Sequence, residues 1–359
     1  MKRLAALLAF TVVLAACGST AHVDSDASRA QGAVFLARTA GAAGPLVAYD
    51  AARLDRRFRL PAGVQAADGR SHYALAGGTL RRFDPFTGTL DRAYAVRGDW
   101  SLAGVSANGA WVALQRSDGR RIRIVDTRTG RTAHDLRFHS RFTVETISSA
   151  GDFLFLQQNF VDGSYAVRGY DLAGKQMLPG SLGTKGEILQ MQGLASQVVA
   201  SRDGRWLLTL YVNTQTNTAF VHALNLIERL AVCINLPPCT NCSREKLQDW
   251  ALALSPEGRT LFAANPALGR VATIYLPVQR LIAEARFEAE PGGETRTAIS
   301  ADGSRFVFTN GTFLWSFDAN TGWARQLPAG ARAIVDLGFR ADGTQLLARK
   351  GAPLLALEL

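Results

Sequence analysis

Short apolar runs separated by turn residues recur along most of this chain. Val105 precedes one turn and Trp111–Leu114 follows it. Leu252–Leu254 and Thr260–Ala263 flank another turn in the same way. Apolar runs of four to eight residues bounded by Gly, Asp, Asn or Pro predict β-strands joined by tight turns.

An Asp-Gly type of turn marks these strand pairs at a regular interval. Its glycines are Gly69, Gly109, Gly151, Gly204, Gly258, Gly303 and Gly343, and their spacings are 40, 42, 53, 54, 45 and 40 residues. Glycine accepts the positive φ that such hairpin turns require. A repeat of 40–50 residues indicates an array of similar structural units.

A second marker follows each of these turns. It is an apolar residue followed by Asp and a turn that usually ends in Gly, with its acid at Asp84, Asp126, Asp171 and Asp318 and degenerate copies at Asp50 and Asn225. Each unit therefore contains a strand, an Asp-Gly turn, two further strands, an Asp turn and a fourth strand. Four antiparallel strands per 40–50 residues form the blade of a β-propeller.

The paired markers carry a resemblance to known repeats. The segment 254–265 (LSPEGRTLFAAN) resembles bacterial YVTN-type and WD40-like propeller repeats, and the resemblance covers residues 33–359. It implies an all-β propeller of four-stranded antiparallel blades. It does not imply a function, because propellers serve as binding modules and as enzymes.

Seven Asp-Gly-type turns favour seven blades, with the last blade closed by strands from the N-terminal end of the domain. However, residues 33–60 and residues 334–357 each contain three strand-like runs. Together they make six strands, which is two more than one four-stranded blade holds. Eight blades are the alternative.

The first residues predict export and lipid anchoring. Lys2 and Arg3 precede an apolar run of about ten residues, which is too short to span a bilayer. The sequence Leu14-Ala-Ala-Cys17 resembles the lipobox of bacterial lipoproteins. This resemblance implies that residues 1–16 are a signal peptide and that Cys17 carries lipid, including palmitate, followed by a flexible tether over residues 17–32. The protein is then extracytoplasmic and anchored to the membrane of the cell envelope. The alternative is an ordinary secretory signal with a chance cysteine.

Three further cysteines, Cys233, Cys239 and Cys242, lie within ten residues of one another. In an exported protein such a cluster favours a disulfide, and we expect Cys233 to pair with Cys239 or Cys242. A zinc site would need a fourth ligand, and no His lies nearby. A redox pair of Cys239 with Cys242 remains open, although no thioredoxin-like βαβ pattern surrounds it.

The formal net charge of +10 predicts attraction to anionic partners. The arginines are spread along the chain and form no basic run with interleaved aromatic residues, so we expect no nucleic-acid partner. We predict neither a metal nor a cofactor. The histidines are scattered; His134 and His139, five residues apart, have no adjacent carboxylate and are interpreted as surface or structural residues.

No G-x-S-x-G, H-E-x-x-H or P-loop pattern occurs, and we assign no catalytic residue. The sequence therefore favours a monomeric binding scaffold at the cell envelope, with an envelope protein or an anionic polymer as partner. The loop Pro237–Asp249 is the first candidate contact, because loops on rigid scaffolds carry function. The alternatives are a hydrolase or lactonase-like enzyme with its site at the central channel, and a structural subunit of the envelope.

Overall fold

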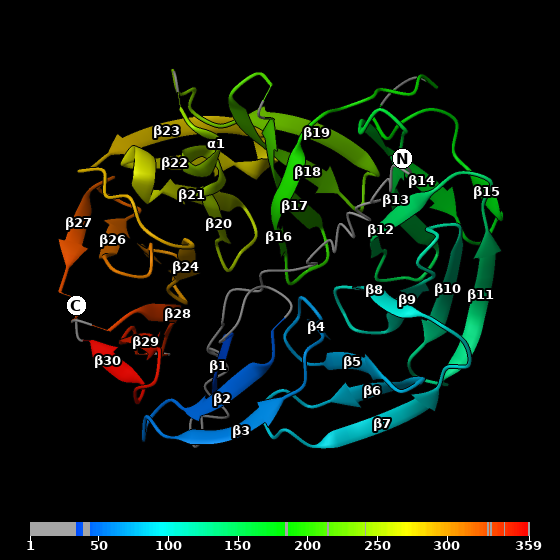
Figure 1. Ribbon diagram of the computed structural model, residues 1–359, viewed down its shortest axis with the longest axis horizontal. Helices are drawn as coiled ribbons and strands as arrows, with labels where there is room; N and C mark the ends of the chain where they lie inside the picture. The colour runs from blue at the N-terminus through cyan, green and yellow to red at the C-terminus, as the bar shows by residue number, and fades with distance from the viewer. Residues whose placement is uncertain are drawn as a thin grey trace, which may run out of the picture.

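The computed structural model describes residues 34–38, 44–183, 186–213, 215–240, 242–328, 330, 332–340 and 342–357. Within these ranges, 30 strands form eight antiparallel sheets that are arranged in a ring (Figure 1). Six sheets have four strands, and the first and last have three. The predicted all-β propeller is confirmed.

The strands of each blade follow one another along the chain, from the inside of the ring outward. Blades 1 to 4 consist of β1 (Val34–Arg38), β2 (Leu46–Asp50) and β3 (Arg56–Leu60); β4 (Val64–Gln65), β5 (His72–Ala76), β6 (Thr79–Phe83) and β7 (Leu90–Ala95); β8 (Ser101–Val105), β9 (Trp111–Gln115), β10 (Arg121–Asp126) and β11 (Arg131–Arg137); β12 (Phe142–Ile147), β13 (Phe153–Asn159), β14 (Tyr165–Asp171) and β15 (Gln176–Met177).

Blades 5 to 8 consist of β16 (Leu194–Ala200), β17 (Trp206–Asn213), β18 (Thr218–Asn225) and β19 (Leu230–Asn235); β20 (Ala251–Leu254), β21 (Thr260–Asn265), β22 (Arg270–Tyr275) and β23 (Arg280–Arg286); β24 (Arg296–Ile299), β25 (Arg305–Thr309), β26 (Leu314–Asp318) and β27 (Ala324–Leu327); β28 (Ile334–Phe339), β29 (Gln345–Arg349) and β30 (Leu355–Leu357). The short helix α1 (Arg244–Gln248) and the 3-10 turns η2 (Pro266–Leu268) and η3 (Leu276–Val278) lie in connections.

The expectation of seven blades, with N-terminal strands completing the last blade, is wrong. The strands at the two ends of the chain form separate sheets, β1–β3 and β28–β30, so the alternative of eight blades is correct. The seven Asp-Gly-type turns mark blades 2 to 8. The connection between β1 and β2 contains no such turn in its sequence, and a count of turns therefore misses blade 1.

The ring closes without a shared strand, by contacts between blades 1 and 8. The backbone N–H of Arg38 on β1 donates to Asp336 Oδ2 on β28 at 2.6 Å. The Phe35 ring lies so close to Gly338 that a methyl group at position 338 would overlap it. A hydrogen bond and close packing thus join the two ends of the chain.

The Asp-Gly turns are held by a repeated hydrogen-bond pattern. In blade 5, Ser201 Oγ donates to Asp203 Oδ1 at 2.6 Å and accepts the N–H of Trp206 at 2.8 Å. Gly204 has φ of +71°, which other residues rarely adopt. Because the side chains satisfy backbone groups that the turn leaves unpaired, the local sequence is sufficient to specify the turn.

The second marker is also a turn-forming acid. Asp318 Oδ1 accepts the N–H groups of Asn320 and Thr321 at 2.8 and 3.0 Å. In blade 3 the glycine that ends this turn, Gly130, lies under the Tyr94 ring of blade 2, and a side chain there would overlap the ring. The marker therefore shapes the turn and makes room for the neighbouring blade.

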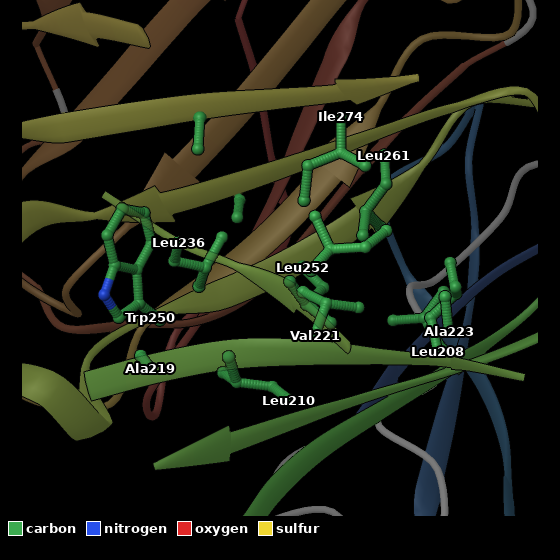
Figure 2. Close-up of a cluster of buried hydrophobic side chains, with 14 of the residues drawn as sticks. Leu208, Leu210, Ala219, Val221, Ala223, Leu236, Trp250, Leu252, Leu261 and Ile274 are labelled. Carbon is green, nitrogen blue, oxygen red and sulfur yellow. The ribbon is translucent and has the colours of Figure 1, made fainter. Parts of the chain in front are cut away.

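The hydrophobic core is divided among the interfaces between blades. Figure 2 shows the cluster between blades 5 and 6, whose labelled members include Leu208, Leu210, Val221, Leu252, Leu261, Ile274 and Trp250. Trp206 is buried in the same cluster. Each fully buried aliphatic side chain contributes roughly 1.5–3 kcal/mol, so these interfaces make the ring rigid.

Candidate binding face

The predicted lipidation site Cys17, the signal peptide and the tether lie outside the described residues. Among the other cysteines, Cys239 and Cys242 form a disulfide, whereas Cys233 is free. The expected pairing of Cys233 with one of the other two is therefore wrong. The disulfide closes a small loop in the connection between β19 and β20.

The register of β19 explains this pairing. Val232 and Ile234, the neighbours of Cys233 on this strand, face the core between blades 5 and 6. Cys239 and Cys242 also pack on that core. Successive strand residues point to opposite faces, so Cys233 faces blade 4. Its Sγ lies 3.5 Å from Met191 Sδ, in the connection that precedes blade 5.

The histidines act as structural residues where they are buried. Burial lowers the pKa of His72 and of His222 to about 4, so both rings are neutral at pH 7. His72 Nε2 is 2.9 Å from the Pro61 carbonyl oxygen. His134 is half-buried on β11, and His139 is exposed beyond the end of that strand.

Two carboxylates on inner strands have raised pKa values. Burial raises the pKa of Glu145 on β12 to about 7, although part of its side chain still reaches the surface. Burial raises the pKa of Asp336 on β28 to about 6. These strands belong to blades 4 and 8, on opposite sides of the ring, and Asp336 already accepts two backbone N–H groups. The two acids therefore do not form a catalytic pair.

No group of three or more metal-binding side chains gathers in the part of the chain that the structure describes. Within the same part, no helix is long and apolar enough to cross a membrane.

The loop predicted as the first contact, Pro237–Asp249, is fastened to the blades. Ser243 caps α1, and Leu247 of α1 is buried in the core. Asn265 Nδ2 donates to the Lys246 carbonyl at 2.7 Å, and Arg270 Nη1 donates to the carbonyl of Pro238 at 2.9 Å. The outer face of α1 is polar, and its apolar residue points inward.

The longest connections between blades lie on either side of blade 5. Residues 178–193 and 236–250 provide 16 and 15 positions, whereas the other five connections provide three to nine. In antiparallel blades, these connections and the turns between the second and third strands lie on one face of the ring. We call this face the loop face.

Exposed apolar side chains gather on the loop face between blades 4 and 5. They are Val161 in the hairpin between β13 and β14, Ile188 and Leu189 in the connection 178–193, and Leu194 at the start of β16. They make up four of the nine large hydrophobic residues found exposed among the described residues. We call these four residues the blade 4–5 patch.

Hydrogen bonds hold the two loops of the patch together. Ser164 Oγ donates to Gln190 Oε1 at 3.2 Å. Tyr165 and Met191 exchange both backbone hydrogen bonds, at 2.7 and 2.9 Å. The hairpin that carries Val161 and the connection that carries Ile188 and Leu189 are thereby fixed side by side.

A stack of aromatic rings supports the patch from below. The Tyr165 and Tyr211 rings stack at 4.8 Å between centroids, and Tyr211 stacks on Phe220 at 5.4 Å. Tyr211 also donates to Gln157 Oε1 at 3.1 Å. The base of the patch is therefore ordered before any partner arrives, which lowers the entropic cost of binding.

The sequence carries a signal for this site in the length of its repeats. The spacing from Gly151 to Gly204 is 53 residues. It is almost equal to the 54 residues from Gly204 to Gly258, the repeat that contains the loop Pro237–Asp249. Both long repeats contain a long connection. How each connection packs against its blades decides which of the two connections exposes apolar side chains.

Comparisons with known proteins find the fold alone. No family model matches the chain, and no curated protein matches its sequence. Among solved structures, the dihydro-haem d1 dehydrogenase NirN, determined in complex with DHE, superposes with a TM-score of 0.54 at 16% identity, covering 90% of this chain and 73% of that one.

Hydrazine synthase of Kuenenia stuttgartiensis (TM-score 0.47, 12% identity) and the Cps50 (Swd1) β-propeller domain of Myceliophteria thermophila (TM-score 0.43, 11% identity) are also similar. Each of the two covers 82% of this chain and 94% of its own. The likeness to NirN supports the β-propeller architecture.

Proposed function

We propose that this protein is a lipid-anchored extracytoplasmic lipoprotein whose propeller binds an envelope protein through the blade 4–5 patch. The observation that carries the binding role is the patch itself. Grouped exposed apolar side chains commonly mark protein interaction sites, whereas apolar side chains exposed singly are normal on any protein surface.

The surroundings of the patch fit a protein partner. Asp162, Glu187 and Gln192 are exposed around it. An apolar centre with a polar rim is the usual anatomy of a protein interface. The described residues of 160–164 and 186–194 include no Lys or Arg.

The anchoring part of the proposal depends on the residues before the propeller. Leu14–Cys17 have the lipobox pattern, and several acyl chains on Cys17 would hold the protein at a membrane firmly. Cys17→Ser should therefore release the protein from the membrane fraction. Unchanged partitioning into detergent would contradict lipid anchoring and would leave the binding role untouched.

The patch is tested by crosslinking on intact cells. A photoreactive amino acid at position 189 should capture one partner reproducibly, and the same group at position 282, exposed on β23, should not. With the photoreactive amino acid at position 161, the double variant Ile188→Ser/Leu189→Ser should no longer capture the partner. The matched control Val278→Ser/Ile282→Ser removes equal apolar surface elsewhere and should leave capture intact. Equal capture by both double variants would refute the patch as the interface.

A further inference from the structure

Almost all the net charge of the protein lies in one part of the chain. Residues 51–144 contain 17 Arg and no Lys against eight acids, a net charge of +9 out of +10 for the whole chain. The arginines recur throughout the sequence, but elsewhere acids balance them. The structure places residues 51–144 on β3, on blades 2 and 3 and at the start of β12, and these blades are consecutive in the ring (Figure 1).

Fourteen arginines of this region are exposed, and eight of them lie on the outer strands of blades 1 to 3. They are Arg56, Arg57 and Arg59 on β3, Arg81 and Arg92 on β6 and β7, and Arg121, Arg131 and Arg137 on β10 and β11. We call these eight residues the arginine wall.

The acids of the region do not neutralise the wall. Asp84, Asp118 and Asp126 each accept backbone N–H groups in turns, which fixes their carboxylates there. Asp135 is shared between Arg121 and half-buried Arg123. Of the eight wall arginines, only Arg121 forms an ion pair with a described carboxylate.

The register sets arginines directly opposite each other in two consecutive blades. Arg82 lies opposite Arg92 between β6 and β7, and Arg121 lies opposite Arg137 between β10 and β11. One arginine of each pair is held by an acid, Arg82 by Asp91 at 3.7 Å and Arg121 by Asp135 at 3.1 Å, whereas Arg92 and Arg137 form no ion pair with a described carboxylate. Arg92 and Arg137 therefore keep positive charge that an anionic partner can bind.

We propose that the arginine wall docks the propeller on the phosphate-bearing headgroups of an anionic membrane. The planar guanidinium group of arginine binds two phosphate oxygens through parallel hydrogen bonds. A surface whose cations are all arginines is therefore suited to phosphate groups. The outer strands of three adjacent blades offer a broad surface rather than a pocket. A broad basic surface is complementary to a charged bilayer.

The broad shape and the charge of the wall favour a membrane over a soluble polymer. A wall spread over three blades matches an extended charged surface. The affinity of the wall for anionic lipid does not depend on the proposed lipid anchor.

The test uses the full chain carrying Cys17→Ser, so that no acyl chain contributes. It should partition onto vesicles that contain phosphatidylglycerol, bind much less to pure phosphatidylcholine, and lose binding as salt rises. Arg59→Gln/Arg81→Gln/Arg131→Gln removes one wall arginine from each blade. Each loss should weaken binding about fivefold and all three by about a hundredfold. The control Arg244→Gln/Arg280→Gln/Arg325→Gln removes equal charge from exposed positions in and near blades 6 and 7 and should change binding little.

Equal binding by the two triple variants, or equal binding to both lipids, would overturn the proposal. Binding to soluble polyphosphate without preference for phosphatidylglycerol vesicles would also overturn it, in favour of a polymer partner. Matching melting temperatures of the two variants would show that both are folded. Because the test protein cannot be acylated, its result is independent of the Cys17 experiment.

Discussion

The backbone N–H of Arg38 donates to Asp336 Oδ2 at 2.6 Å, and this bond joins residues that are 298 positions apart. It links the first strand of blade 1 to the first strand of blade 8, where neither blade takes a strand from the other. Asp336 also accepts its neighbour's N–H, from Leu337 at 2.9 Å. One buried carboxylate thus satisfies two backbone donors at the closing point of the ring.

Asp336→Ala should weaken the closure of the ring. It leaves the buried N–H of Arg38 without this acceptor, which typically costs about 1–3 kcal/mol. Chemical denaturation followed by tryptophan fluorescence measures the loss. Asp336→Asn keeps an oxygen acceptor and should lose less stability than the alanine variant; an equal loss in both would show that the bond to Arg38 does not hold the ring closed.

Glu145→Gln should change the pH dependence of stability. The pKa of the carboxyl is about 7 in the folded protein against 4.5 for the free group, so the folded state favours the neutral form. Its contribution is fully present below pH 4.5 and is lost as the pH rises to 7. The glutamine variant should match the wild type at pH 4 and exceed it at pH 8 by at most roughly 3 kcal/mol.

The difference between variant and wild type is the quantity to measure for Glu145. His72 and His222 have folded pKa values of about 4, so their contribution is lost as the pH falls from 6.5 toward 4. They titrate in an overlapping range with the opposite sign, and subtraction removes them. A stability difference that stays constant from pH 4 to pH 8 would contradict the raised pKa of Glu145.

The disulfide predicts a specific thiol count. With Cys17→Ser, the unreduced native chain should show one titratable thiol, that of Cys233, and Cys233→Ser should remove it. Burial raises the pKa of this thiol, so its reaction at neutral pH should be slow. Cys239→Ala/Cys242→Ala should lower stability by about 2 kcal/mol, as expected for a short closed loop. A peptide bridging Cys233 to either residue in mass spectrometry would contradict the pairing.

Arg137→Glu should stabilise the fold. It replaces a like-charge pair with Arg121 by an opposite-charge pair, worth roughly 0.2–1 kcal/mol in a sheet. The gain should shrink at high salt. Arg325→Glu, opposite the uncharged Ser316, serves as the control and should be close to neutral. A destabilised Arg137→Glu variant would show that repulsion across β10 and β11 is absent.

Sequence reasoning succeeded where the information is local. Asp203 and Gly204 form their turn through hydrogen bonds within six residues, so the recurring pattern predicts each blade that carries it. The local pattern does not give the number of blades, because blade 1 lacks the turn marker and because closure depends on residues as distant as Arg38 and Asp336.

The sequence by itself determined the propeller class, the repeating unit and the three clustered cysteines, because turns and strand patterns are properties of neighbouring residues. Only the tertiary structure decided that Cys233 faces blade 4 while Cys239 and Cys242 face blade 6, since strand alternation and blade packing set those directions. It also decided that apolar residues from two loops form one patch and that arginines from three blades form one wall. Both surfaces combine segments far apart in the chain, whose proximity exists only after the ring has closed.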